Sequence, residues 1–134
     1  FNAYGMLCIE LFVTKDQHVL VNELAPRPHN SGHYTIEGCV TSQYENHIRA
    51  ILGLPLGSTE LICPTVMKNI IGNVNKKAEV HGLEEAYKYP EVKIHIYGKE
   101  ECRVGRKMGH ITVTDKTIED ALFKARYAHS KIKF

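Results

Sequence analysis

Two glutamates, Glu10 and Glu23, interrupt stretches that otherwise consist mainly of apolar, β-forming residues. If the two stretches form a hairpin with a two-residue tip, antiparallel pairing places the two carboxylates opposite each other, with Cβ atoms about 5 Å apart. Facing carboxylates repel unless a cation lies between them, and magnesium at a nucleotide phosphate is an obvious use. A three-residue tip would instead place Asn22 opposite Glu10. Two solvent-exposed glutamates without a ligand are the alternative interpretation.

A second candidate group lies in residues 25–33, which read APRPHNSGH. The two prolines restrict the backbone around Arg27 and lower the entropy of the segment. Five of its side chains suit the binding of an anion or a polar ring: Arg27, His29, Asn30, Ser31 and His33. A surface turn capped by its own side chains would have the same composition. A zinc site built from His29, His33 and Cys39 would lack a fourth ligand.

A third candidate group is residues 99–110, KEECRVGRKMGH, which hold four cations and two glycines. Arginine offers a planar fork and lysine a point charge, so the segment could bind a phosphate. If the chain reverses at Gly105, Lys99 and Arg106 can converge on one dianion. A solvated loop with charges of both signs is the alternative. The motifs GxxxxGK[ST] and GxGxxG do not occur in the sequence, so nucleotide-binding loops of those kinds are excluded.

The elements that must position the first two groups are predicted from residue pattern. Short apolar runs predict a hairpin of strands 6–14 and 18–24. Residues 25–38 show no sustained period and predict an ordered loop. A helix over 41–53 follows, with Ser42 and Glu45 in capping-box spacing.

The linker-like residues 54–58 place a domain boundary near residue 60. In the second half, strands are predicted over 62–72, 92–98 and 110–114, and helices over 83–88 and 117–129, the latter with Thr117 as N-cap. Because residues 92–98 alternate strictly, their strand is expected to be half-buried and antiparallel. The sequence therefore predicts an α+β fold, in which residues 61–134 form a small antiparallel sheet covered by the last helix.

Length and charge exclude several classes of protein. The 134 residues include 17 basic and 15 acidic side chains, a net charge of +2, which is too balanced to predict binding to nucleic acid or to a membrane surface. No apolar run approaches the roughly 20 residues of a membrane span. The four cysteines lack CxxC spacing and are typical of a reducing, cytoplasmic setting. The chain begins at Phe1 without methionine and soon enters a strand, which indicates a piece of a longer protein.

Taken in order, the three groups resemble 5-(carboxyamino)imidazole ribonucleotide synthetase, an ATP-grasp ligase family of purine synthesis. The matching residues are 10–12, 22–35, 41–45, 49–50, 54–57, 97–100 and 105–110. The run NELAPRPHNSGH is the most specific of them. The resemblance implies that residues 1–60 are the C-terminal part of an ATP-grasp domain and that residues 61–134 are a small β-rich C-terminal domain. It also implies that the larger N-terminal parts would precede Phe1.

The resemblance further implies an activity: ATP-dependent carboxylation of 5-aminoimidazole ribonucleotide by bicarbonate. Glu10 and Glu23 would bind Mg²⁺, Asn22 and Glu23 would bind ATP, and Arg27 and His29 would be catalytic. The residues implied for substrate binding are Arg27, His29, Asn30, Ser31, Lys99 and Arg106. The full-length enzyme would be a cytoplasmic homodimer without nucleic-acid or membrane partners. This chain alone would be inactive.

Two alternatives remain open at this point. A formate-dependent glycinamide ribonucleotide transformylase, a sister ATP-grasp enzyme, also carries a PRPH run after an acidic strand. It is expected to depart from this sequence at residues 30–33. The second alternative is a binding or dimerisation fragment without turnover.

Overall fold

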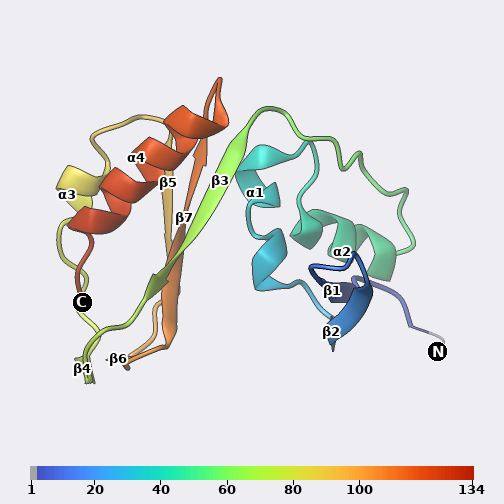
Figure 1. Cartoon of the computed structure of the whole chain (residues 1–134), viewed down its shortest axis with the longest axis horizontal. Coiled ribbons are helices and arrows are strands. Elements are labelled where there is room, and N and C mark those ends of the chain that lie inside the picture. The colour runs from blue at the N-terminus through green and yellow to red at the C-terminus, as the bar shows by residue number, and fades with distance from the viewer. Residues whose placement is uncertain (1–2) are drawn as a thin grey trace. The chain divides into compact units, whose positions relative to one another are not determined.

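The computed structural model describes residues 3–134 and has an α+β architecture, as predicted (Figure 1). The chain divides into two compact units, Phe1–Ile62 and Cys63–Phe134, which are described separately below. The domain boundary predicted near residue 60 lies beside this division.

The first unit begins with an antiparallel hairpin of β1 (Cys8–Val13) and β2 (Val19–Ala25). The sequence allowed a tip of two or of three residues, and the structure has the three-residue tip. Gln17 adopts the left-handed conformation, with φ of 66°, and its N–H donates to the Thr14 carbonyl at 3.0 Å. A left-handed residue at the end of a three-residue tip is the usual way to close such a hairpin.

A β-bulge then changes the register of the hairpin. Beside the tip, Leu11 pairs with Val21, a register that would bring Asn22 opposite Glu10. The register shifts between Glu10 and Leu11, and Glu10 pairs with Glu23 instead. Asn22 is the extra residue of the bulge, so Asn22 and Glu23 together oppose Glu10. The carboxylate pairing expected from a two-residue tip is therefore present, although the tip has three residues.

The segment predicted as a loop over 25–38 is partly helical, which corrects that expectation. It contains a 3-10 turn, η1 (Asn30–Gly32), and a single helical turn, α1 (Thr35–Gly38). Turns this short have no measurable period, so the pattern of the sequence does not reveal them. The predicted helix is present as α2 (Gln43–Ile51), and the Ser42 side chain accepts from the Glu45 N–H at 3.1 Å, which confirms the cap.

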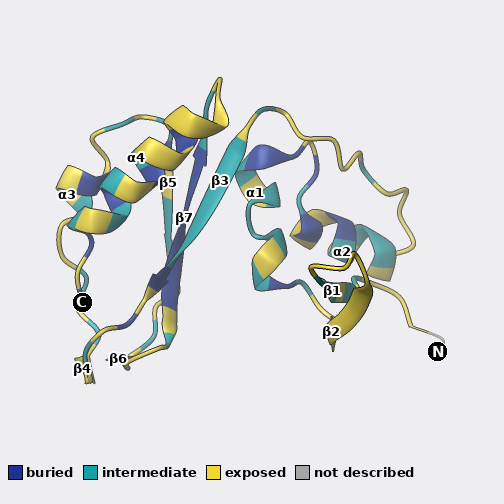
Figure 2. Ribbon diagram, in the orientation of Figure 1, coloured by how far each residue is buried: buried dark blue, intermediate teal, exposed yellow. Residues whose placement is uncertain are grey.

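Most apolar residues of the hairpin are exposed within this unit, and Figure 2 shows most of β2 in the exposed colour. More than half of each of the following residues is exposed: Ile9, Leu11, Phe12, Val13, Val19, Leu20, Val21 and Leu24. Two strands without a further layer are marginally stable in water. The hairpin therefore contributes little core to this unit.

The second unit is built on an antiparallel sheet of β3 (Thr65–Ile71), β7 (Lys107–Thr114) and β5 (Val92–Ile96), in that order. This confirms the predicted antiparallel pairing. The central strand β7 is longer than the predicted strand 110–114, because residues assigned to the preceding loop pair with β3 on one side and β5 on the other. Figure 2 shows β7 as the most buried strand.

A second correction concerns the rest of the predicted loop over residues 99–110. β6 (Glu101–Cys102) pairs antiparallel with β4 (Lys76–Lys77), so residues 101–102 belong to a strand. Each strand has two residues, which is too short for an alternating pattern to be recognised. β6 divides the connection between β5 and β7 into two short segments, residues 97–100 and 103–106, of which the second contains a turn.

The core of the second unit lies between the sheet and α4 (Ile118–Lys131), which contacts β3, β7 and β5. The helix packs closely because its inward residues are small. The fully buried alanines are Ala121, Ala125 and Ala128. The short α3 (Leu83–Ala86) packs on α4, and Thr117 accepts from the Asp120 N–H at 3.1 Å, as predicted. Over residues 3–134, none of the helices combines the length and hydropathy of a membrane span.

Candidate active site

The bulge in the hairpin gathers three polar side chains at one point. The Asn22 amide nitrogen donates to Glu10 Oε2 at 3.2 Å, and Glu23 is the register partner of Glu10. A regular strand would send residues 22 and 23 to opposite faces, but a bulge brings both toward the same partner residue. The two carboxylates and the amide therefore lie close together, where one ligand could contact all three.

His29 completes this group. Its side chain is almost buried, and its Nδ1 lies 3.3 Å from Glu10 Oε1 while its Nε2 lies 3.8 Å from Glu23 Oε1. One ligand atom from each of the three residues lies within 4.8 Å of the others. Each nitrogen of the imidazole thus faces a different carboxylate, so a proton on either nitrogen has a negatively charged neighbour. Sequence reasoning proposed the glutamate pair and the histidine, but not this single cluster.

The donor set of the cluster fits a hard divalent cation. Carboxylate and amide oxygens are the protein ligands that Mg²⁺ prefers, and such an ion usually keeps several waters. The side chains of Glu10 and Glu23 are 33% and 49% exposed, which leaves room for those waters and for a phosphate oxygen. The imidazole of His29 is not a preferred ligand of Mg²⁺.

The backbone of His29 is held by α2 through a side chain to which the sequence reasoning gave no role. The Gln43 amide nitrogen donates to the His29 carbonyl at 2.8 Å, and the His29 N–H donates to Gln43 Oε1 at 3.0 Å. Ser31 Oγ lies 2.8 Å from His29 Nδ1. A glutamine directly after a helix N-cap is a weak signal, and only its burial in the structure distinguishes it.

The other predicted residues of this segment lie around the cluster. Arg27 is exposed, and its guanidinium donates to the Pro28 carbonyl at 3.1 Å. Asn30 is half-buried at the start of η1, and Ser31 follows it. Ser31 joins the cluster through His29, because its Oγ lies beside the imidazole Nδ1.

In the second unit, Lys99 and Arg106 line one surface pocket of about 390 Å³. Lys99 Nζ donates to the Lys107 carbonyl at 2.6 Å, and Arg106 Nη1 donates to the Glu101 carbonyl at 3.0 Å. The chain reverses at Gly105, whose φ of 80° is in the left-handed region that favours glycine. Lys99 and Arg106 thus line the same pocket on either side of this reversal, and their binding of one dianion stays a prediction.

The turn that carries Arg106 is fixed to the end of β3. The Gly72 N–H donates to the Arg106 carbonyl at 2.8 Å, and the Gly105 N–H donates to the Gly72 carbonyl at 2.9 Å. Burial, followed by the nearby charge of Arg106, lowers the pKa of Lys99. Two like charges are therefore held together by the fold, and an anion between them would relieve their repulsion.

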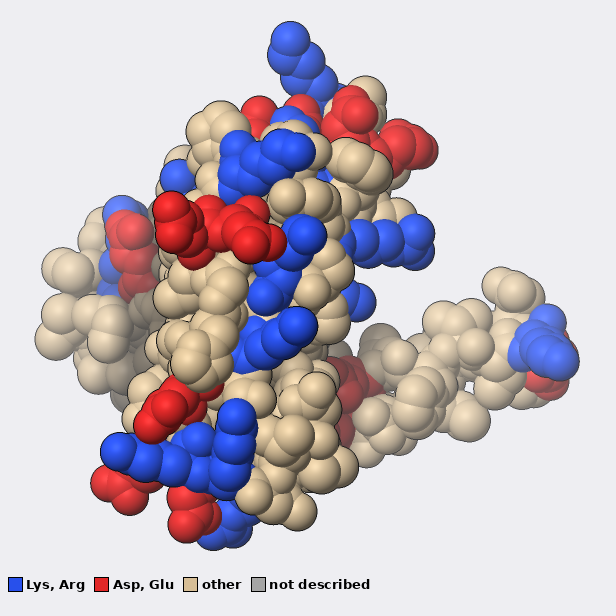
Figure 3. Space-filling view, turned by 90° about the vertical axis from the view of Figure 1, so that its left-hand side faces the viewer, with Lys and Arg blue, Asp and Glu red and all other residues tan. Residues whose placement is uncertain are grey.

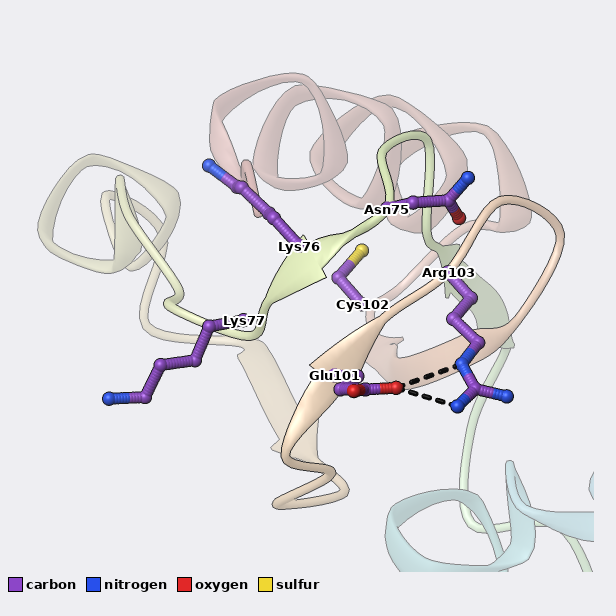
Figure 4. Close-up of a pocket in the computed structure, with 6 residues that line it drawn as sticks. All are labelled: Asn75, Lys76, Lys77, Glu101, Cys102 and Arg103. Carbon is purple, nitrogen blue, oxygen red and sulfur yellow. Dashed lines mark hydrogen bonds and ion pairs between the residues drawn. The ribbon is translucent and has the colours of Figure 1, made fainter.

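Arg103 lies in the same turn but is neutralised locally. Its Nε and Nη2 donate to Glu101 Oε2 at 3.0 and 2.6 Å, beside a pocket of about 300 Å³ (Figure 4). Figure 3 shows the same mixture on a larger scale, with basic and acidic side chains interspersed over the face in view. Arg106 differs from Arg103 because its guanidinium donates to the Glu101 carbonyl and not to the carboxylate, although, after the hydrogen bond from Arg103, its nearby charge also helps to lower the pKa of Glu101.

Residues 1–44 match the ATP-grasp domain family, and residues 65–124 match the family described as the phosphoribosylaminoimidazole carboxylase C-terminal domain. The facing carboxylates of the hairpin lie within the residues that match the ATP-grasp domain family, so the first unit carries part of an ATP-grasp domain. The chain is 55% identical to the N5-carboxyaminoimidazole ribonucleotide synthase of Bacillus subtilis, over 83% of this chain and 28% of that protein.

Two solved structures give the same result. The N5-carboxyaminoimidazole ribonucleotide synthetase of Thermotoga maritima is 56% identical, with a TM-score of 0.87 over 97% of this chain and 37% of that one. The Aspergillus clavatus synthase, in complex with ADP and 5-aminoimidazole ribonucleotide, is 40% identical, with a TM-score of 0.82 over 97% of this chain and 35% of that one. By sequence and by fold, the chain corresponds to the C-terminal portion of the N5-carboxyaminoimidazole ribonucleotide synthetase family.

Proposed function

We propose that this chain is the C-terminal portion of a ligase that joins bicarbonate to the exocyclic amine of 5-aminoimidazole ribonucleotide at the expense of ATP, in de novo purine biosynthesis. The observation that carries the proposal is the pairing of Glu10 with Glu23 beneath the imidazole of His29. The similarity to a synthase crystallised with ADP and this ribonucleotide supports the choice of ligands. In this proposal residues 1–60 are the C-terminal part of an ATP-grasp domain, and residues 61–134 form the small C-terminal domain.

Glu10 and Glu23 are proposed as the ligands of Mg²⁺ at the ATP phosphates, with Asn22 beside the nucleotide. Magnesium, when bound, neutralises charge on the phosphates. Phosphoryl transfer depends mainly on positioning and on such neutralisation. The hairpin would serve both positioning and charge neutralisation, because the bulge holds two carboxylates and one amide close together.

In the proposed reaction, bicarbonate first accepts the γ-phosphoryl group and becomes carboxyphosphate. The amine nitrogen of the ribonucleotide then attacks the carboxyl carbon. The new C–N bond forms, the C–O bond to phosphate breaks, and the amine loses a proton. We assign that proton to His29, because its imidazole lies between the two carboxylates and an unprotonated ring nitrogen can accept a proton. Arg27 is proposed to neutralise charge at the reacting carboxyl group.

The remaining roles concern recognition of the ribonucleotide. Asn30 and Ser31 are proposed to contact it next to Arg27 and His29. Lys99 and Arg106 are proposed to bind its 5′-phosphate, since both line one pocket. On the resemblance alone, the proposal extends to a cytoplasmic homodimer that uses bicarbonate as the second substrate.

The complete protein that contains this chain should release phosphate only when ATP, bicarbonate and 5-aminoimidazole ribonucleotide are all present. The 134-residue chain alone should release none above background, because its apolar hairpin is left uncovered and it corresponds to about a third of the related enzymes. A coupled ADP assay on both proteins measures this. If the complete protein released phosphate at the same rate with and without the ribonucleotide, the proposed function would be rejected. Robust turnover by the isolated chain would reject its assignment as an inactive portion.

Replacing Arg106 with alanine in the complete protein should weaken ribonucleotide binding by roughly 10- to 100-fold, since a charge-assisted hydrogen bond contributes about 1.5–3 kcal/mol. Affinity for Mg·ATP should barely change, because that site is built around Glu10 and Glu23. Arg106→Lys should recover only part of the loss, because lysine lacks the bidentate fork. Titrations with both ligands measure these affinities.

Arg103→Ala is the matched control for this prediction. It removes the same charge from the same turn, but that charge is already paired with Glu101. We expect a change of less than about threefold in ribonucleotide affinity, as for an exposed ion pair. Equal weakening by Arg103→Ala, or equal weakening of both ligands by Arg106→Ala, would contradict a phosphate site at Arg106.

A further inference from the structure

We propose that Gln43 is a positioning residue, which sets His29 at its place between the two carboxylates. The inference rests on the proposed function, because the position of His29 matters only if that residue takes part in the reaction. Gln43 is the first residue of α2 and is only 8% exposed.

The amide of Gln43 hydrogen-bonds to both backbone groups of one residue. Its Nε2 donates to the His29 carbonyl at 2.8 Å, and its Oε1 accepts from the His29 N–H at 3.0 Å. Two bonds to one residue fix both its distance from the helix and its orientation. No other contact described over residues 3–134 holds the His29 backbone at both groups from another element.

Further bonds fix Gln43 itself. Its backbone N–H, which has no partner within the helix, donates to Thr35 Oγ1 at 2.9 Å, and Thr35 Oγ1 donates to the Gly32 carbonyl at 2.6 Å. Gly32 lies so close that an added Cβ would come 2.5 Å from Gln43 Oε1. The segment that follows His29 is therefore packed directly against the glutamine amide.

This arrangement leaves the side chain of His29 with little freedom to move away from its neighbours. Ser31 orients the imidazole ring through Nδ1, but Ser31 belongs to the same short segment and moves with it. Gln43 lies on a capped helix instead, 14 residues further along the chain. Loss of its amide would let the segment shift, and a displacement of about 1 Å can reduce turnover by roughly 10²-fold.

Asn46 offers a matched control one helical turn away. It is also 8% exposed, and its amide also bonds to both backbone groups of one residue: Nδ2 donates to the Gly57 carbonyl at 3.2 Å, and Oδ1 accepts from the Gly57 N–H at 2.8 Å. Gly57 belongs to the segment after α2, which carries none of the proposed site residues. Asn46→Ala therefore removes a similar buried amide without releasing His29.

The experiment compares Gln43→Ala and Asn46→Ala in the complete protein, with thermal unfolding measured alongside kinetics. We expect similar decreases in Tm for the two variants. Gln43→Ala should lower kcat by roughly 10- to 100-fold with less than about threefold change in the KM for Mg·ATP. Asn46→Ala should change kcat by less than about threefold. Equal losses of kcat in the two variants, or wild-type kcat in Gln43→Ala, would overturn the inference.

A double-mutant cycle with His29→Ala separates positioning from a general structural effect. If Gln43 acts through His29, Gln43→Ala should lower kcat by less than about threefold once His29 is already alanine, because the two effects are then not additive. A full additional loss would overturn the inference. If the wild-type protein showed no phosphate release that depends on the ribonucleotide, the proposed function itself would be rejected.

Discussion

Replacing His29 with asparagine in the complete protein should lower kcat by roughly 10²- to 10⁴-fold, the range over which a positioned acid–base group contributes to catalysis. Asparagine keeps a polar side chain but cannot accept the proton that the amine must lose. The Kd for Mg·ATP should stay within about threefold, because the proposed metal ligands are retained. Single-turnover carboxylation at saturating substrate, together with nucleotide titration, measures both quantities.

His18→Asn is the control for this substitution. His18 lies on the same hairpin unit but is exposed at the tip, with Asp16 Oδ2 at 3.6 Å from its Nδ1 as its ionic contact. We expect a change in kcat of less than about threefold, as for a surface substitution. Loss of less than about tenfold in His29→Asn, or a comparable loss in His18→Asn, would mean that His29 is not the proton acceptor.

Replacing Glu23 with glutamine should lower ATP turnover by roughly 10²- to 10³-fold, since a metal ion at a phosphate contributes several kcal/mol and 1.4 kcal/mol corresponds to tenfold. The substitution keeps the shape of the side chain and removes its charge. The remaining carboxylate of Glu10 would then hold Mg²⁺ alone, so the concentration of Mg²⁺ needed for half-maximal activity should rise. ADP production measured across a magnesium titration tests this expectation.

The control is Asp16→Asn, which removes one carboxylate from the same hairpin at its exposed tip. Its magnesium dependence should equal that of the wild type. An unchanged magnesium dependence in Glu23→Gln would remove Glu23 from the proposed metal site. A shift of the same size in Asp16→Asn would show that the effect reflects the total charge of the hairpin and not a bound ion.

Local patterns were enough to predict the elements whose signals lie within a few residues. Ser42 and Thr117 cap the two long helices at the expected places, because each cap is a contact between residues three apart. The strands β3, β5 and β7 were found from apolar patterning, and their antiparallel pairing followed from their close succession. The resemblance to a ligase family likewise depended on runs of consecutive residues such as 22–35.

The pairing of Glu10 with Glu23 could not be decided in this way. The sequence allowed two tips, and each gave a different partner for Glu10. The structure has the three-residue tip together with a bulge at Asn22, so the glutamates face each other by a route that neither simple register describes. The position of a bulge depends on how the two strands pair along their whole length, so residues 22 and 23 alone do not reveal it in the sequence.

The sequence by itself determined which residue types were available: two carboxylates on a hairpin, a proline-restricted segment with His29, and a turn with Lys99 and Arg106. Only the tertiary structure decided that His29 lies between the two carboxylates and that Gln43 holds its backbone. These contacts join residues 6 to 19 positions apart, on separate elements. Caps and turns depend on neighbours along the chain and are therefore visible in sequence. Contacts between elements depend on how each element packs, and packing is settled by the fold as a whole.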